Sequence, residues 1–311
     1  MSRTIALTGA TGFIGSRLAR CLQSAGWQIQ VLVRPNSDRN RLAGVDVKWV
    51  EGDLDNFDSL RKFVRNAYAV IHCAGAVRGI SAAQFNQVNV DGVARLVQAA
   101  IEQHPLPRFF LISSIAAREP HLSPYAGSKR QGERALCETA GAMRWTALRP
   151  SAVYGPGDRE MLPLFLWAQR GIAPVLASDN ARFSVLYVED LADAVKALIE
   201  HDQCQQNIFE LHDGHQHGYS WQEVIDTIAK LRNKRVITIH VPEMILGLLA
   251  RLNLTAAGII GYAPMLTPGK VRELRHPNWV CDNSMIQDKI GWRPKISLGE
   301  GLRLTLRQAK G

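Results

Sequence analysis

Short apolar segments recur along the first half of the chain, each bounded by turn residues or charges. Such runs are typical of strands buried on both faces of a sheet, and they lie at residues 4–7, 29–33, 47–50, 69–73, 109–112 and 145–148. Between them, apolar residues recur at helical spacing, as in Ile14, Leu18 and Leu22 and in Val93, Leu96, Val97 and Ala100. This alternation predicts an α/β fold with a doubly wound parallel sheet and a ligand site at the carboxyl ends of its strands.

The pattern changes after residue 155. An apolar stretch at 161–167 follows a polar turn, and strand and helix signals return at 183–188 and 190–199. We therefore expect a major domain formed by residues 1–155 and 183–210. A smaller, discontinuous substrate-binding domain would comprise residues 156–182 and 211–311.

Composition narrows the classes of function. The net charge of +9 over 311 residues favours an anionic partner, but Lys and Arg are scattered and not interleaved with aromatic residues, which argues against nucleic acid. The five cysteines include no C-x-x-C pair, so neither a disulfide framework nor a thiolate metal site is indicated. The first residues show no export leader, and we expect a cytoplasmic protein.

The stretch Thr8–Gly15 reads T-G-A-T-G-F-I-G, with glycines at positions 9, 12 and 15. It lies between the first predicted strand and the first predicted helix. There the backbone must turn sharply, and free N–H groups at the helix start attract a phosphate. A tight turn with no ligand is the plainer interpretation of the same glycines.

Further motifs follow in an order that resembles the extended short-chain dehydrogenase/reductase family, the NAD(P)-dependent epimerase/dehydratase group, with features similar to 3β-hydroxysteroid dehydrogenases and sugar-nucleotide epimerases. They are Gly52–Leu54, His72–Gly75, Asn89–Gly92, Ser113-Ser114, Tyr125-x-x-x-Lys129, Leu148–Pro150, Val153–Gly157 and Val188–Ala192. The resemblance implies that the major domain is an NAD(P)-binding Rossmann domain. It also implies cofactor contacts from Gly9, Thr11, Gly12, Phe13, Ile14, Gly15, Asp53, Leu54, Cys73, Ala74, Gly75, Tyr125, Lys129, Pro150 and Val153.

The catalytic residues that the resemblance implies are Ser114, Tyr125 and Lys129. On a helix, residues four apart share a face, so Lys129 would lie beside the Tyr125 phenol and favour its ionised form. Tyr125 could then exchange a proton with a substrate oxygen that Ser114 holds. A half-exposed tyrosine beside a solvated lysine is the alternative.

Arg34 follows the second predicted strand, where an acidic residue would bind the ribose hydroxyls of NAD. A guanidinium pairs instead with a 2′-phosphate, and Ser37, Arg39 and Arg41 could assist it. The sequence therefore favours NADP(H), while NAD(H) stays acceptable if Arg34 stacks on the adenine or faces solvent.

Three residues are candidates for contact with the substrate, namely Ala76, Ser114 and Arg182, and one segment also bears on its identity. Arg182 occupies the position of an arginine that contacts a diphosphate in sugar-nucleotide epimerases, although a salt bridge explains it equally well. The segment Met244–Tyr262 is apolar, yet Arg251 and Asn253 argue against a membrane-spanning helix. Its stripe, Ile245, Leu248, Leu249 and Leu252, predicts core packing. A lid over a lipid-like substrate and a weak contact with a membrane surface are alternatives.

His212, His215 and His217 invite a metal hypothesis, but no carboxylate or cysteine completes the set and the expected chemistry needs no metal. We therefore expect none.

Together these residues indicate an NAD(P)-dependent oxidoreductase that transfers hydride at a secondary alcohol or ketone carbon. A nucleotide-sugar epimerase with the same three catalytic residues is one alternative. Another is a non-catalytic NADPH-binding accessory subunit or sensor, because the short loop 115–124 is similar to that of respiratory subunits. Residues 115–117 are apolar, which argues against a dehydratase, since dehydration usually needs an acid there. The substrate would be a nucleotide sugar or a hydrophobic alcohol or ketone, and the protein a homodimer or a monomer.

Overall fold

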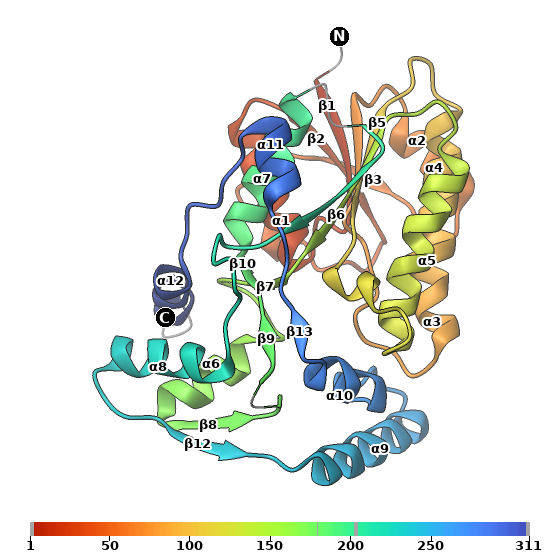
Figure 1. Ribbon diagram of the computed structural model, residues 1–311. Helices are drawn as coiled ribbons and strands as arrows, with labels where there is room; N and C mark the ends of the chain where they lie inside the picture. Colours follow the sequence, from red (N-terminus) through yellow and green to blue (C-terminus); the bar gives the residue numbers. More distant parts are fainter. Residues whose placement is uncertain (1–2, 179, 202–204, 309–311) are drawn as a thin grey trace.

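The computed structural model describes the chain except residues 1–2, 179, 202–204 and 309–311. Its centre is a seven-stranded sheet, with strand order β11-β6-β5-β4-β1-β2-β3, in which every pairing is parallel (Figure 1). The strands are β1 (Thr4–Thr8), β2 (Gln28–Val33), β3 (Lys48–Glu51), β4 (Ala69–His72), β5 (Arg108–Ile112), β6 (Trp145–Pro150) and β11 (Asn207–Leu211). The predicted doubly wound parallel sheet is confirmed.

Helices cover both faces of this sheet because successive side chains of its central strands point to opposite sides. In β5, Phe110 and Ile112 join the core under α1 (Phe13–Ser24), α7 (Val188–Glu200) and α11 (Ser284–Ile290). Phe109 and Leu111 join the opposite core, under α2 (Phe57–Val64), α4 (Gly92–Ile101) and α5 (Pro124–Thr139). Strands buried on both sides explain why their sequences read as continuous apolar runs.

Several elements from the second half of the chain build a separate layer below the sheet (Figure 1). A third core gathers α6 (Leu162–Arg170), α8 (Trp221–Arg232) and α12 (Leu298–Gln308) around β7 (Ala152–Tyr154), β8 (Ile172–Val175) and β10 (Val185–Tyr187). β8 pairs with β12 (Ile237–His240), and β9 (Arg182–Phe183) with β13 (Asn278–Trp279). Ile286 and Trp292, however, pack in the core of the main sheet. The boundaries of the two expected domains stay a prediction.

The strand signal at 183–188 corresponds to two short strands with different partners. β9 pairs with β13, whereas β10 pairs with β7, and neither belongs to the main sheet. The seventh strand of that sheet is β11, whose alternating sequence N-I-F-E-L was not recognised as a strand.

The helix α9 (Glu243–Ile260) corrects one expectation. Its stripe Ile245, Leu248, Leu249 and Leu252, predicted to pack in a core, is exposed. The helix instead buries Leu246, Ala250 and Ala257, on its opposite face. That face packs beside α10 (Pro268–Arg275) through Val271, with Leu176 and Leu266 alongside. Periodicity identified the helix correctly, but both of its faces are apolar, so the pattern could not choose the buried one.

Candidate active site

The glycines of the first loop are held in tight contacts where β1 meets α1. Gly9 has φ +68°, and a Cβ there would lie 2.5 Å from the backbone nitrogen of Ala74, after β4. A Cβ on Gly15 would lie 2.2 Å from the carbonyl oxygen of Gly9. Gly12 is the N-cap of α1 and provides no side chain to cap the helix. The first N–H groups of α1 therefore face the loop without a side-chain acceptor.

The loop after β4 is fixed by two polar residues that the sequence reasoning did not single out as site residues. The buried Asn89 accepts from the backbone N–H of Ala76 and donates to its carbonyl, both at 2.9 Å, and also donates to Ser128 Oγ at 2.9 Å. Thr8 accepts from the backbone N–H of Ala74 at 3.2 Å. These bonds tie the loop to β1 and to α5. Asn89 belongs to the motif Asn89–Gly92, which marked the family without assigning it a role.

Ser114 and Tyr125 meet at the carboxyl end of β5. Ser114 follows that strand and caps the short 3₁₀ helix 115–118, accepting from the N–H of Ala116 at 3.2 Å. Tyr125 is the second residue of α5, and the Ser114 side chain lies near enough to its hydroxyl to act on its pKa. The Phe85 ring packs edge-on against the Tyr125 ring, with centroids 6.1 Å apart. Burial raises the pKa of Tyr125, and the nearby Ser114 hydroxyl acts in the opposite direction.

Lys129 lies one turn further along α5 and is buried. Its Nζ donates to the carbonyl oxygen of Ile112 at 2.8 Å and would lie 3.8 Å from a Cβ on Gly75. Burial lowers the pKa of Lys129 to about 8. The structure thus brings the three predicted catalytic residues into one region beside the loop after β4. The expected effect of Lys129 on the Tyr125 pKa stays a prediction.

A charged pair that was not predicted from the sequence, Lys270 and Glu273, lies beside Tyr125. Lys270 Nζ lies 2.9 Å from Glu273 Oε2 on α10, and Glu273 also accepts a hydrogen bond from Ser123, the N-cap of α5. A Cβ on Gly269 would lie 2.8 Å from Ser123 Cβ, which shows how closely α10 approaches α5. The Glu273 charge acts to raise the pKa of Tyr125 and the Lys270 charge acts to lower it. The motif Thr267-Pro268 signals a helix start, but not which helix it contacts.

A buried ion pair supports α5 from the other side. Glu133 accepts from Arg149 Nε at 2.9 Å and Nη2 at 2.6 Å, and from the Ser113 hydroxyl at 2.5 Å. Both charged residues are buried, and the hydrogen bonds that Arg149 donates to Glu133 raise the pKa of Arg149. This two-point contact fixes α5 relative to the ends of β5 and β6.

The remaining predicted cofactor residues lie at this edge of the sheet because the carboxyl ends of parallel strands share one edge. Asp53 and Leu54 follow β3, and Pro150 ends β6, with Val153 in β7. Thr11, Phe13 and Ile14 lie in or after the glycine loop. Cys73, Ala74 and Gly75 follow β4.

Arg34 follows β2 and is exposed. Ser37 Oγ accepts from the Arg34 backbone N–H at 3.2 Å, which closes the turn after the strand. The other two predicted assistants have contacts elsewhere: Arg39 lies over the Trp49 ring at 4.8 Å, and Arg41 donates to the Gly157 carbonyl at 2.9 Å. Of the four residues, Arg34 and Ser37 are therefore the better candidates for a contact with a 2′-phosphate at the end of β2.

Arg182 forms the salt bridge that was one of its two interpretations. Its Nη1 lies 3.2 Å from Glu223 Oε2 and donates to the Gly218 carbonyl at 3.0 Å.

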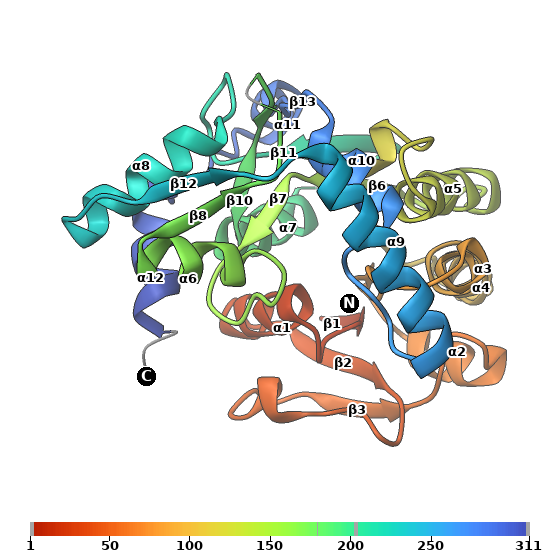
Figure 2. The same ribbon diagram turned by 90° about the horizontal axis from the view of Figure 1, so that it is seen from below.

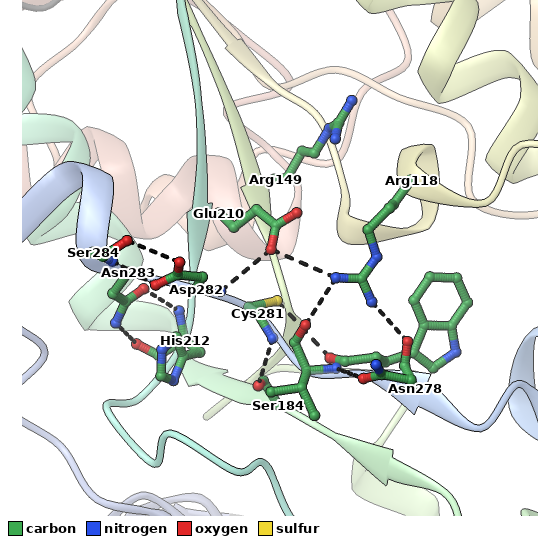
Figure 3. Close-up of polar contacts among 12 residues, drawn as sticks. Arg118, Arg149, Ser184, Glu210, His212, Asn278, Cys281, Asp282, Asn283 and Ser284 are labelled. Atoms are coloured by element: carbon green, nitrogen blue, oxygen red, sulfur yellow. Dashed lines mark hydrogen bonds and ion pairs between the residues drawn. The ribbon is translucent and has the colours of Figure 1, made fainter.

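A polar network anchors the C-terminal segment to the main sheet (Figure 3). Arg118 donates to the carbonyl oxygens of Val280 at 2.8 Å and Asn278 at 2.7 Å, and forms an ion pair with Glu210 at 3.7 Å. Asn283 exchanges two hydrogen bonds with the His212 backbone, each at 2.9 Å. Burial lowers the pKa of His212.

Within the described ranges, no group of three His, Cys, Asp or Glu side chains could hold a metal ion.

Comparison with known proteins gives this arrangement a context. The model of the NAD dependent epimerase/dehydratase family matches residues 5–211. The chain is 35% identical to the ceramide reductase of Caulobacter vibrioides, over 97% of this chain and 93% of that protein. It is 26% identical to the UDP-glucose 4-epimerase of Vibrio cholerae, over 98% and 95%. The structure of UDP-glucuronic acid 4-epimerase from Bacillus cereus in complex with UDP-glucuronic acid and NAD has a TM-score of 0.77, 19% identity and 99% coverage of both chains, which shows a common fold.

Proposed function

The chain belongs to the NAD dependent epimerase/dehydratase family, and on that premise we propose that it transfers hydride at a secondary alcohol or ketone carbon, with Ser114, Tyr125 and Lys129 as its catalytic residues. The observation that carries this proposal is the proximity of the Ser114 side chain to the Tyr125 phenol at the carboxyl edge of the sheet, with Lys129 one turn along α5. The family is described as NAD dependent, so hydride chemistry suits the site.

The residues at this edge fit a dinucleotide. Gly9 and Gly15 allow the loop to turn tightly against neighbouring backbone, where a Cβ would clash, and the start of α1 offers N–H groups with no side-chain cap. A bound nicotinamide cofactor would supply or accept the hydride. Arg34 supports a preference for NADP(H), because its exposed guanidinium at the end of β2 can pair with a 2′-phosphate but cannot accept ribose hydroxyls. NAD(H) is the alternative cofactor.

Tyr125 is suited to give a proton to a carbonyl oxygen. Burial raises its pKa, so the phenol is protonated at neutral pH, as a proton donor in reduction must be. The Ser114 hydroxyl, near the same phenol, can hold the reacting oxygen. Oxidation of an alcohol uses the same groups in reverse, and the Lys270 charge favours the phenolate that it requires, as we expect of Lys129.

For the substrate we favour a ketone or secondary alcohol on a long apolar chain. Arg182, the residue expected to contact a diphosphate, is paired with Glu223. The relative that is 35% identical over 97% of this chain is named a ceramide reductase, whereas the epimerase named above is 26% identical. A nucleotide-sugar epimerase remains the second candidate, supported by that relative.

The test uses two assays. In one, the protein is incubated with NADPH and a ceramide-type lipid that carries a ketone, and in the other with NAD and UDP-glucose. We expect NADPH oxidation with the lipid. Tyr125→Phe should lower kcat by roughly a hundredfold or more while dinucleotide affinity is kept. The matched control Tyr68→Phe removes the hydroxyl of a tyrosine that packs on Trp27, before β4, and should retain activity.

Other outcomes distinguish the alternatives. Epimerisation of UDP-glucose without oxidation of NADPH by the lipid would replace the reductase proposal with the epimerase one. Dinucleotide binding without turnover of any alcohol or ketone, unaffected by Tyr125→Phe, would indicate a non-catalytic NADPH-binding subunit or sensor.

A further inference from the structure

The helix α9 exposes a continuous apolar face. Of the eighteen large apolar side chains that are exposed in the described part of the chain, ten lie between residues 237 and 262. Seven of these are on α9 itself: Met244, Ile245, Leu248, Leu249, Leu252, Ile259 and Ile260. Met244 is 87% exposed and Ile259 82%, near opposite ends of the helix. A contiguous apolar surface of this kind marks an interaction site.

This face lies on one side of the molecule. Seen from below, α9 runs across the near surface, with β12 leading into it and α10 beside it (Figure 2). Ile237 and Ile239 of β12, both exposed, precede the helix, and Tyr262 follows it. The face is opposite α11, which is at the top of the molecule in Figure 1.

Basic residues are frequent in the segment that contains β12 and α9. Residues 230–275 contain eight Lys and Arg (Lys230, Arg232, Lys234, Arg235, Arg251, Lys270, Arg272 and Arg275) and two acidic residues, Glu243 and Glu273, for a net charge of +6 out of +9 for the chain. Glu243 pairs with Arg275 at 3.0 Å and Glu273 with Lys270 at 2.9 Å, so both carboxylates are already neutralised. Four of the cations precede β12 and Arg251 lies on α9, so the exposed apolar residues of β12 and α9 belong to a basic segment, which is complementary to the surface of an anionic bilayer.

From these observations we infer that α9 and β12 form a membrane-docking face, which inserts Leu248, Leu252 and their neighbours into the interfacial layer of a bilayer that contains anionic lipid.

A second copy of the chain fits this face less well. A two-fold interface places the same patch on both partners, so two segments of net charge +6 would face one another with no unpaired carboxylate between them. Anionic headgroups supply the opposite charge that a second copy does not.

The geometry favours a helix that lies on the bilayer over one that crosses it. α9 is long and apolar enough to span, with 17% of its residues buried, and at 1.5 Å per residue it is roughly 27 Å long. However, β12 before it pairs with β8, and α10 after it packs back against its buried face. Both ends therefore stay on the same folded body, whereas a spanning helix would place them on opposite sides of the hydrocarbon core.

The docking face is connected to the active site. α9 packs on α10, and α10 contacts the start of the helix that carries Tyr125 through Glu273 and Ser123. A bilayer held at α9 would bring a membrane lipid close to the end of α10 that faces Tyr125. This last consequence rests on the proposed lipid substrate, whereas docking itself does not.

The test is co-sedimentation of the full chain with vesicles of phosphatidylcholine alone and of phosphatidylcholine with roughly one third phosphatidylglycerol. We expect binding to the anionic vesicles that weakens as salt is raised. The double variant Leu248→Glu/Leu252→Glu should reduce the partition coefficient by roughly tenfold or more, because it places two charges on the inserting face. The control double variant Met285→Glu/Leu106→Glu adds the same charges at exposed positions outside this face and should bind as the wild type does.

Each contrary result overturns docking through α9. The wild type could fail to sediment with either vesicle, or the control variant could lose as much binding as the α9 variant. A dimer in vesicle-free solution that Leu248→Glu/Leu252→Glu converts to a monomer would show that the face is an interface between copies. Sedimentation needs no turnover, so a protein that binds vesicles but reduces no lipid would contradict the proposed function and leave docking intact.

Discussion

Glu273, on α10, accepts a hydrogen bond from Ser123, which caps the helix that carries Tyr125, although the two residues are 150 positions apart in the chain. The same carboxylate holds Lys270 at 2.9 Å. The C-terminal part of the chain therefore contributes a charged pair to the surroundings of the proposed proton donor. It also links the exposed helix α9 to that site through α10.

This pair leads to opposite pH effects of two substitutions. The Lys270 charge acts to lower the pKa of Tyr125 and the Glu273 charge acts to raise it. Lys270→Met should therefore raise the pH at which kcat for alcohol oxidation reaches half of its maximum. Glu273→Gln should lower that pH. The pH dependence of kcat for oxidation measures both shifts. Shifts in the same direction would contradict a direct electrostatic action on the phenol.

Arg34→Ala tests the choice of cofactor. Loss of the guanidinium should raise the Kd for NADPH by roughly tenfold or more, because a charge-assisted contact with the 2′-phosphate is removed, while the Kd for NADH changes little. Fluorescence titration with both dinucleotides gives the ratio. The control Arg39→Ala removes a guanidinium that lies over Trp49 and should keep the preference. Equal affinities for the two cofactors in the wild type would show that Arg34 does not read the phosphate.

Gly15→Ala tests the packing of the first loop. The new Cβ would lie 2.2 Å from the Gly9 carbonyl oxygen, so the loop must shift and dinucleotide binding should be lost. We expect the free energy of unfolding to fall by about 2 kcal/mol. Gly258→Ala is the control, since Gly258 lies on α9 with no atom within 4 Å of its added Cβ. That change should stabilise by about 0.5–1 kcal/mol. Chemical denaturation measures both.

Glu133→Ala should be among the most destabilising single changes. It leaves the buried Arg149 guanidinium without its two-point partner, at a cost of about 3–5 kcal/mol in the free energy of unfolding. Glu138→Ala, at an exposed position of the same helix, should change that free energy by less than about 0.5 kcal/mol. Similar losses in the two variants would mean that the ion pair contributes nothing specific.

His72 should make stability depend on pH. Burial, assisted by the Lys129 charge, lowers the pKa of His72 from 6.5 to about 3, so the folded protein holds a neutral ring where the unfolded chain takes up a proton. The contribution of the neutral His72 ring to the free energy of unfolding is then fully present above pH 6.5. It is lost as the pH decreases toward 3, by at most about 1.4 kcal/mol per pH unit. His72→Asn should flatten this dependence relative to the wild type. The exposed His217→Asn should not, and a wild-type curve that is flat across this range would contradict the prediction.

The sequence alone determined the features that depend on local pattern. Continuous apolar runs predicted the first six strands of the sheet, and the spacing of Gly9, Gly12 and Gly15 predicted a close turn before α1 because neighbouring residues settle that geometry. Helical spacing likewise identified α9 as a helix. The motifs around Ser114, Tyr125 and Lys129 proposed the candidate site through their resemblance to a known family.

Only the tertiary structure decided what depends on contacts between distant segments. No local pattern shows that α10 places Lys270 and Glu273 beside α5, or that Arg182 pairs with Glu223. The apolar stripe of α9 satisfies the rule for a buried face, yet Leu246 and Ala250 are buried and Leu248 and Leu252 are exposed. A helix that is apolar on both faces buries the one that contacts its neighbours, here Val271 of α10 together with Leu176 and Leu266.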